Sequence, residues 1–370
     1  MRAVSYAAYR QWPELVDLPD PVCPADGVLV RVAASGVCRS DWHAWQGHDP
    51  VPLPMVPGHE FAGEVAEVGA RVRGWRVGDR VVVPFACGCG QCPVCRAGDT
   101  HVCPEQTQPG FTGWGSFAEL VAVHAADTNV VARPPGLDPV AAAALGCRYA
   151  TAHRALVGVG RLAADEWLVV HGCGGVGLSA VQIGVALGAR VIAVDVSAQA
   201  LTRATELGAV GTLLLRRGQG TGEPAPPPTE LTAPTAPDQV AARLVEMTDG
   251  GPHLHVDAIG SPGALQAGVL ALRPRGRHVQ VGLLLGADAS CPVPMSRVVA
   301  RELAVVGAHG MPAGDYPGLL ALLDPARGAQ ALRPQQLIGR VIGLADAPAA
   351  LAAFGEPAAY PGLTVIDLQR

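Results

Sequence analysis

The sequence predicts an α/β protein of two domains, one β-rich and barrel-like, the other built on a doubly wound parallel sheet. Two observations support this prediction. Short strands bounded by turns fill residues 1 to 147, whereas from residue 148 apolar strands alternate with helical stretches of roughly ten to fifteen residues. The length of 370 residues also exceeds that of an ordinary single domain.

The strands of the first half are marked by alternating side chains and by glycine or proline at their borders. The clearest candidates are residues 27–32, 63–69 and 78–84. Alternation with period two is typical of strands that bury one face, so we expect a mostly β unit here.

The second half has six strand candidates separated by helical patterns, at residues 167–170, 190–194, 212–215, 255–259, 278–281 and 303–306. This rhythm is typical of βαβ units, whose strands are parallel. Between residues 217 and 238 lies a tract rich in proline, glycine and threonine, which we expect to be a surface excursion or a mobile loop rather than helix or interior strand.

The composition excludes several classes of protein. The net charge is −5 and the basic residues form no stripe, so nucleic acid is not an expected partner. No apolar run reaches the ~18 to 20 residues of a membrane span, and the first nine residues do not read as a secretory signal. We therefore expect a cytoplasmic protein, whose ten cysteines serve metal or redox chemistry rather than disulfides.

Four cysteines stand close together at spacings typical of a closed metal site. Cys89, Cys92, Cys95 and Cys103 could form a tetrahedral sulfur shell, which is how structural Zn²⁺ is held. The alternatives are reduced cysteines that cluster by chance and an iron–sulfur cluster. Cys87 is surplus to this set, either a bystander or an alternate ligand.

A glycine-rich turn follows the first strand of the second half. Gly172 would make the tight turn, Gly174 would let the backbone approach a pyrophosphate, and Gly177 would allow close packing of helix on strand. The phosphate-binding turn and helix start also include Gly175 and Val176. The next strand ends at Asp195, where a carboxylate would meet the ribose hydroxyls of NAD and repel the 2′-phosphate of NADP. Alternatively, Asp195 only caps the following helix.

The order of the remaining metal-ligating residues carries a resemblance. Cys38 comes first, His59-Glu60 follows, then the four-cysteine loop, and Cys147 stands just before the second half. Over nearly the whole chain this order resembles the zinc-dependent medium-chain alcohol dehydrogenases. The resemblance implies a GroES-like catalytic domain of residues 1–147 and 311–370, with a Rossmann dinucleotide-binding domain of residues 148–310.

The resemblance also implies the roles of particular residues. Catalytic zinc would be bound by Cys38, His59 and Cys147, with the fourth position open for water or substrate. Glu60 would lie beside the metal and could ligate it transiently, and Asp41 would accept a hydrogen bond from His59. Ser40 and His43 would relay the proton released by the alcohol. Arg39 would contact the cofactor pyrophosphate, Thr151 the nicotinamide side, and Phe85 and Trp114 are candidate pocket walls.

The expected activity is hydride transfer between an alcohol, or its aldehyde or ketone, and NAD(H), with two zinc ions per chain in a homodimer or homotetramer. One departure is that residues 362–365 lack the arginine that many relatives carry near the C-terminus. The alternatives are a zinc hydrolase, which leaves the glycine turn and Asp195 without a role, an NADP(H)-preferring carbonyl reductase of the same family, and a non-enzymatic zinc- and nucleotide-binding protein.

Overall fold

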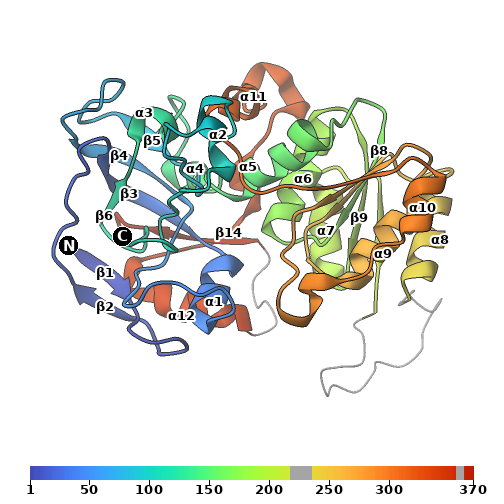
Figure 1. The fold of residues 1–370 in the computed structure, drawn as a ribbon, viewed down its shortest axis with the longest axis horizontal. Helices are drawn as coiled ribbons and strands as arrows, with labels where there is room; N and C mark the ends of the chain where they lie inside the picture. The colour runs from blue at the N-terminus through green and yellow to red at the C-terminus, as the bar shows by residue number, and fades with distance from the viewer. Residues whose placement is uncertain (217–235, 356–361) are drawn as a thin grey trace. The chain divides into compact units, whose positions relative to one another are not determined.

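The structure is a computed structural model that describes residues 1–216, 236–355 and 362–370 (Figure 1). It divides into two compact units. The first contains residues 1–151, 309–327 and 333–370, and the second contains residues 152–308 and 328–332. The tail that follows residue 309 therefore belongs mostly to the first unit.

Most strands of the first unit pair antiparallel, whereas residues 338–342 pair parallel with residues 363–366. Its main sheet has the order β14-β15-β3-β4-β5-β7 in the described residues, with β6 paired to β3, and a separate hairpin joins β1 to β2. The strands are β1 (Arg2–Ser5), β2 (Glu14–Asp17), β3 (Val28–Val37), β4 (Phe61–Val68), β5 (Arg80–Val82), β6 (Leu120–Val123), β7 (Val131–Ala132), β14 (Ile338–Ile342) and β15 (Leu363–Asp367).

Alternation in β3 explains how this sheet forms its core. Val28, Val30 and Val32 are buried together with Phe61 and Val65 of β4. Because successive side chains of a strand point to opposite faces, this pattern directs one face of β3 inward. Short helices close the unit: α1 (Arg39–Gln46), α2 (Pro93–Arg96), α3 (Ala126–Asn129), α4 (Pro139–Ala143), α5 (Arg148–His153), α11 (Tyr316–Ala321) and α12 (Ala347–Ala352).

The second unit contains a six-stranded parallel sheet of order β10-β9-β8-β11-β12-β13 in the described part of the chain. This order, with β8 and β11 as inner neighbours, is the doubly wound arrangement. The strands are β8 (Trp167–His171), β9 (Arg190–Asp195), β10 (Gly211–Leu214), β11 (Leu254–Asp257), β12 (Arg277–Gln280) and β13 (Ala304–Gly307). The predicted fold class, α/β with a doubly wound parallel sheet, is confirmed.

Helices cover this sheet because their apolar sides match its two faces. Val240 and Leu244 of α8, and Ala267 of α9, pack with Val169 and Val194 of the sheet in one buried cluster, and Figure 1 shows α8 and α9 beside the strands, with α6 and α7 on their other side. The helices are α6 (Gly175–Ala186), α7 (Ala198–Glu206), α8 (Pro237–Met247), α9 (Pro262–Ala271) and α10 (Met295–Ala300).

The expectation that residues 217–238 form no helix is wrong at the C-terminal end of this tract. Residues 217–235 lie outside the described residues, but α8 begins at Pro237 and includes Asp238. Proline is tolerated at the first position of a helix, since the N–H that it lacks would have no intrahelical partner there. The last two residues of the tract, Pro237 and Asp238, therefore lie in the first turn of a helix.

The core of the second unit contains a buried polar network. His255 of β11 and His278 of β12 are neighbours in register, and their Nδ1 atoms lie 3.1 Å apart. Gln280 Nε2 donates to Asp257 Oδ2 at 3.0 Å and to Gly282 O at 2.8 Å, which leaves its Oε1 to accept from His278 Nε2 at 3.1 Å. His278 Nδ1 is then an acceptor, so His255 Nδ1 carries the donated proton.

Candidate metal centres and dinucleotide turn

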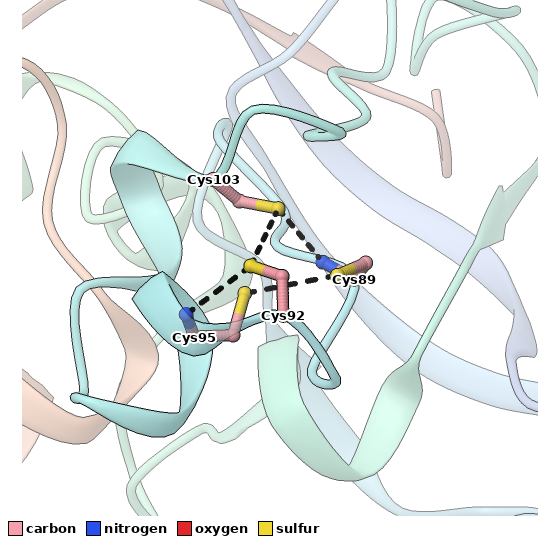
Figure 2. Close-up of side chains that lie close together, drawn as sticks. All are labelled: Cys89, Cys92, Cys95 and Cys103. Carbon is pink, nitrogen blue, oxygen red and sulfur yellow. Dashed lines mark hydrogen bonds between the residues drawn. The ribbon is translucent and has the colours of Figure 1, made fainter.

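The four cysteines of the 89–103 loop converge on one point. Their sulfur atoms all lie within 4.8 Å of one another, and Figure 2 shows the four side chains turned toward a common centre. Cys92 caps α2 and Cys95 lies within it, whereas Cys103 directly follows a short 3₁₀ turn, Thr100–Val102. Local backbone structure therefore assembles the whole cluster.

The spacing of the sulfur atoms suits a tetrahedral metal. Sulfur atoms bound to one zinc at about 2.3 Å lie about 3.8 Å apart, and the distance from Cys92 Sγ to Cys103 Sγ is 3.7 Å and from Cys89 Sγ to Cys95 Sγ 4.0 Å. Backbone N–H groups also donate to the sulfurs, including that of Glu105 to Cys103 at 3.3 Å. Such donors stabilise thiolates, which are the form that binds zinc.

Cys87 does not belong to this cluster. Its thiol donates to the carbonyl of Pro84 at 3.3 Å, and burial raises its pKa to about 12. Its sulfur is not among the four that lie within 4.8 Å of one another. Of the two alternatives open from the sequence, the structure favours a bystander.

A second cluster joins Cys38, His59 and Cys147, which come from three distant segments. All three are buried, and their ligand atoms lie within 4.8 Å of one another. The Cys147 thiol hydrogen-bonds to Cys38 and, as the largest effect, lowers the pKa of Cys38 well below its ordinary value. Three soft or borderline donors leave room for a fourth ligand, as catalytic zinc sites do.

The buried carboxylate of Asp41 holds this cluster together. Its Oδ1 lies 2.8 Å from His59 Nδ1 and accepts from Gly58 N at 3.0 Å, while its Oδ2 accepts from Cys38 N at 3.0 Å. The carboxylate therefore holds a proton on Nδ1 of His59 and leaves Nε2 as the ligand atom.

Glu60 forms a buried ion pair with Arg148 beside the cluster. Burial raises the pKa of Glu60 to about 7, opposed by the charge of Arg148. The guanidinium also donates to the carbonyl of Val37 at 2.5 Å. Arg148 was not anticipated from the sequence, although a lone arginine directly after Cys147 in an otherwise apolar run is a signal that could have revealed it.

Helix α1 carries the residues expected to serve the proton relay and the pyrophosphate. Ser40 Oγ lies 3.8 Å from Cys38 Sγ, and His43 lies one turn further along, half-buried. Arg39 is exposed, and its guanidinium lies 5.5 Å from the ring centre of Phe354 and 6.0 Å from that of Trp42. One short helix thus presents all three side chains.

The aromatic surroundings of His59 differ partly from the expected pocket walls. The rings of Phe85 and Phe111 lie edge-on to the imidazole, with centroids at 5.9 and 5.2 Å. Trp114 instead packs against an apolar core cluster of the first unit. Phe111 was missed, because nothing in its local sequence distinguishes it from a core aromatic residue.

The glycine turn after β8 has the backbone that the sequence predicts. Gly172 has φ +97, and a Cβ there would lie 2.4 Å from Ile259. A Cβ on Gly177 would lie 1.7 Å from the carbonyl oxygen of Gly172, so helix and strand approach as only glycine permits. Gly174 is exposed and is the N-cap of α6, which begins at Gly175 and Val176, and no side chain caps this helix start. The first N–H groups of a helix have no intrahelical partner, so such an end suits an anion.

Asp195, at the end of β9, is tied to this turn. Its Oδ2 accepts from Cys173 N at 2.6 Å and its Oδ1 from Ser197 N at 2.8 Å. The helix N-cap itself is Ser197, whose hydroxyl accepts from Ala200 N. Thr151 is buried in α5, and its N–H donates to the carbonyl of Cys147 at 2.8 Å.

The structure combines three features: a closed cluster of four thiols, a second cluster of two cysteines and one histidine with room for a fourth ligand, and a doubly wound sheet with a glycine turn. Together they define a zinc-dependent oxidoreductase. Residues 24–135 match the alcohol dehydrogenase GroES-like domain, and residues 228–324 match the zinc-binding dehydrogenase domain. The chain belongs to the zinc-dependent medium-chain alcohol dehydrogenase family and is a zinc-dependent alcohol oxidoreductase.

Individual relatives extend over most of the chain. This chain is 32% identical over 310 residues to an alcohol dehydrogenase of Geobacillus stearothermophilus. The matched residues cover 83% of this chain and 84% of the relative. A sorbitol dehydrogenase of Halalkalibacterium halodurans is 30% identical over 313 residues, 83% of each chain. The structure of alcohol dehydrogenase TADH from Thermus sp. ATN1 superposes with a TM-score of 0.84 at 28% identity, covering 99% of each chain.

Membership of this family sets the zinc hydrolase alternative aside. It also argues against a binding protein without turnover. In the described residues, no helix is both long and apolar enough to span a membrane.

Proposed function

We propose that this protein is an NAD-dependent alcohol dehydrogenase that holds two zinc ions per chain and transfers hydride between an alcohol and NAD(H). The observation that carries the proposal is the buried cluster of Cys38, His59 and Cys147, in which Asp41 leaves Nε2 of His59 free to bind a metal. Cys89, Cys92, Cys95 and Cys103 would hold the second, structural ion with no open position.

Zinc at the open cluster would supply a Lewis acid that lowers the pKa of the substrate hydroxyl. Around it the chain supplies the environment. The rings of Phe85 and Phe111 lie edge-on to His59 and would shield one side of the cluster from water. The carboxylate of Glu60 lies beside the ligands and would approach the metal when another ligand leaves. Arg148 forms an ion pair with this carboxylate and so offsets its negative charge.

The proton relay would begin at Ser40 and continue to His43. Ser40 is two residues from Cys38, with its hydroxyl 3.8 Å from the thiol, and His43 follows on the same helix. Burial is the largest cause that lowers the pKa of His43. A lowered pKa favours the neutral imidazole, which is the form that can accept a proton.

The dinucleotide would bind at the turn of Gly172, Gly174 and Gly177, where it supplies the hydride acceptor. The N-terminus of α6, from Gly175 and Val176, would receive the pyrophosphate, with Arg39 as a cationic partner and Thr151 on the nicotinamide side. Asp195 supports NAD over NADP because its carboxylate would repel a 2′-phosphate, and Cys173 N and Ser197 N hold it at the turn.

We further propose that residues 1–147 and 311–370 form the catalytic domain and residues 148–310 the dinucleotide domain. The chain would assemble as a homodimer or homotetramer, as is usual for symmetric enzymes. Its substrate would be a small alcohol, aldehyde or ketone. The ten free thiols support a reducing, cytoplasmic location, where the zinc-binding thiolates are not oxidised.

A substrate panel beside a metal count tests this function. Ethanol, butan-2-ol, benzyl alcohol and sorbitol are offered with NAD and with NADP, and the matching carbonyl compounds with the reduced cofactors, while absorbance at 340 nm is followed. We expect turnover with NAD and two zinc ions per chain. Turnover with NADP alone would favour the carbonyl reductase alternative, and no turnover with two zinc ions would contradict the assignment of the site.

A further inference from the structure

The end of α1 places two imidazole rings against each other. The Nδ1 atoms of His43 and His48 lie 3.1 Å apart, and the ring centroids are 5.4 Å apart at an interplanar angle of 49°. His43 is half-buried, whereas His48 is exposed. One hydrogen bond therefore connects the inner ring to a ring in contact with solvent.

Backbone structure fixes this pair. Gly47 ends the helix in the left-handed conformation, φ 78, and its N–H donates to Ala44 O at 3.0 Å, while His48 N donates to His43 O at 2.9 Å. These are the two hydrogen bonds of a Schellman motif, which reverses the chain and returns residue 48 to the last helical turn. The indole of Trp42 lies edge-on to both rings, with centroids at 5.0 and 5.5 Å.

We propose that His48 is the outer member of the proton path, a role that rests on the relay proposed above. Oxidation of the alcohol gives one hydride to NAD and one proton to the relay. His43 accepts the proton at Nε2 and passes its Nδ1 proton to Nδ1 of His48, and the exposed imidazolium releases it to water. Exchange with water between turnovers restores the starting tautomer of His43. In carbonyl reduction the proton moves inward.

The charges around the pair are compatible with this direction. Besides burial, His48 and Arg39 lower the pKa of His43, and Cys38 and Asp49 raise it to a lesser extent. Arg10 also reaches this helix end, where its Nε donates to the carbonyl of Gln46 at 3.4 Å. The inner ring therefore disfavours a retained charge, and its hydrogen bond offers the proton a route to solvent.

The test compares proton release with NADH formation in the zinc-loaded enzyme. Stopped-flow measurements use phenol red in weakly buffered solution and the panel alcohol of highest kcat/KM. His48→Gln can keep a hydrogen bond to His43 but cannot carry a proton. We expect it to slow proton release about 10-fold or more, to leave the alcohol KM unchanged, and to recover when imidazole is added. The matched control is His124→Gln, because His124 is an exposed histidine of the first unit that directly follows β6 and is not part of α1.

Each outcome decides one part of the proposal. If His43→Gln slows proton release and His48→Gln behaves as the unmodified enzyme, His48 is outside the path while the relay through His43 stands. If neither variant is affected, the relay of the proposed function is wrong as well. A slow His48→Gln enzyme that imidazole does not restore would show a structural role and overturn the proposal.

Discussion

At the scale of single residues, the site depends on hydrogen bonds that fix ligand orientation. Asp41 contacts Cys38 N, Gly58 N and His59 Nδ1 with one carboxylate. Three groups from two segments of the chain thus share a single buried carboxylate. A zinc ion at this cluster depends on His59 for its only nitrogen ligand among the three residues.

Replacing His59 tests the metal assignment directly. We expect His59→Ala to lower kcat about 10³-fold or more, because the metal contributes several kcal/mol to the stabilisation of the transition state. The zinc count should fall from two to one per chain, with the far-UV circular dichroism unchanged. Cys147→Ser, which conserves volume, should behave in the same way. A purified His59→Ala enzyme with full activity would show that the catalytic metal is assigned to the wrong residues.

Asp195 tests the choice of cofactor. Asp195→Asn removes the charge that opposes a 2′-phosphate but keeps one acceptor for the N–H of Cys173 or Ser197. We expect the ratio of kcat/KM for NAD to that for NADP to fall about 10-fold, which corresponds to about 1.4 kcal/mol. Steady-state rates with each cofactor measure the ratio. An unchanged ratio would mean that Asp195 holds the backbone of the glycine turn but does not select between the two cofactors.

At the scale of elements, close approaches decide which residues a helix can contain. A Cβ on Gly268 in α9 would lie 2.4 Å from Nδ1 of His255, whereas a Cβ on Gly263 in the same helix would meet nothing within 4 Å. The imidazole of His255 therefore occupies the space that a side chain at residue 268 would need. Sequence alone shows two equivalent glycines in one helix.

This difference predicts opposite effects of the same substitution. Gly268→Ala should lower the free energy of unfolding by about 1–3 kcal/mol, because the methyl group overpacks the core against a ring. Gly263→Ala is the matched control and should raise it by about 0.4–1 kcal/mol. Urea unfolding followed by circular dichroism measures both. Equal effects would show that the imidazole of His255 moves aside freely.

The four-cysteine loop predicts a second effect at this scale. Cys103→Ser removes one of four thiolates, so we expect loss of one zinc ion per chain and a lower melting temperature. Cys87→Ser is the control, since Cys87 lies two residues before that loop and its thiol donates to Pro84 O. It should keep both zinc ions. Loss of zinc in the control as well would mean that Cys87 is a ligand after all.

At the scale of the whole molecule, acid should destabilise the protein through its buried imidazoles. Burial is the largest cause that lowers the pKa values of His171, His255 and His278. Asp257 and Asp195 oppose the shift of His171, and Gln280 and Asp257 that of His278. The native state thus keeps these rings neutral where the unfolded chain binds protons.

The direction of the pH effect follows from that difference. Stability is full above the unfolded histidine pKa of about 6.5 and falls as the pH drops below it, by at most about 1.4 kcal/mol per pH unit for each ring. Melting temperatures between pH 8 and pH 5 measure the change. His255→Leu should reduce the slope below pH 6.5. A steeper slope in that variant would contradict this explanation.

Features that depend on local spacing could be predicted from the amino-acid sequence. The cysteines at 89, 92, 95 and 103 lie within one short loop, so their spacing predicted a closed cluster that the structure also assembles. The glycine turn and the six strands of the parallel sheet were likewise readable, because a period of two or 3.6 residues and a positive φ are properties of short segments.

Contacts between distant segments became known only from the folded chain. The family resemblance implied that Cys38, His59 and Cys147 lie together. The folded chain brings their ligand atoms within 4.8 Å of one another. The Glu60–Arg148 pair, Phe111 beside His59 and the histidines on β11 and β12 had no local signal strong enough to be predicted. The physical reason is that these contacts join residues far apart in sequence, and their pairing is set by sheet register and side-chain packing, which no short pattern encodes.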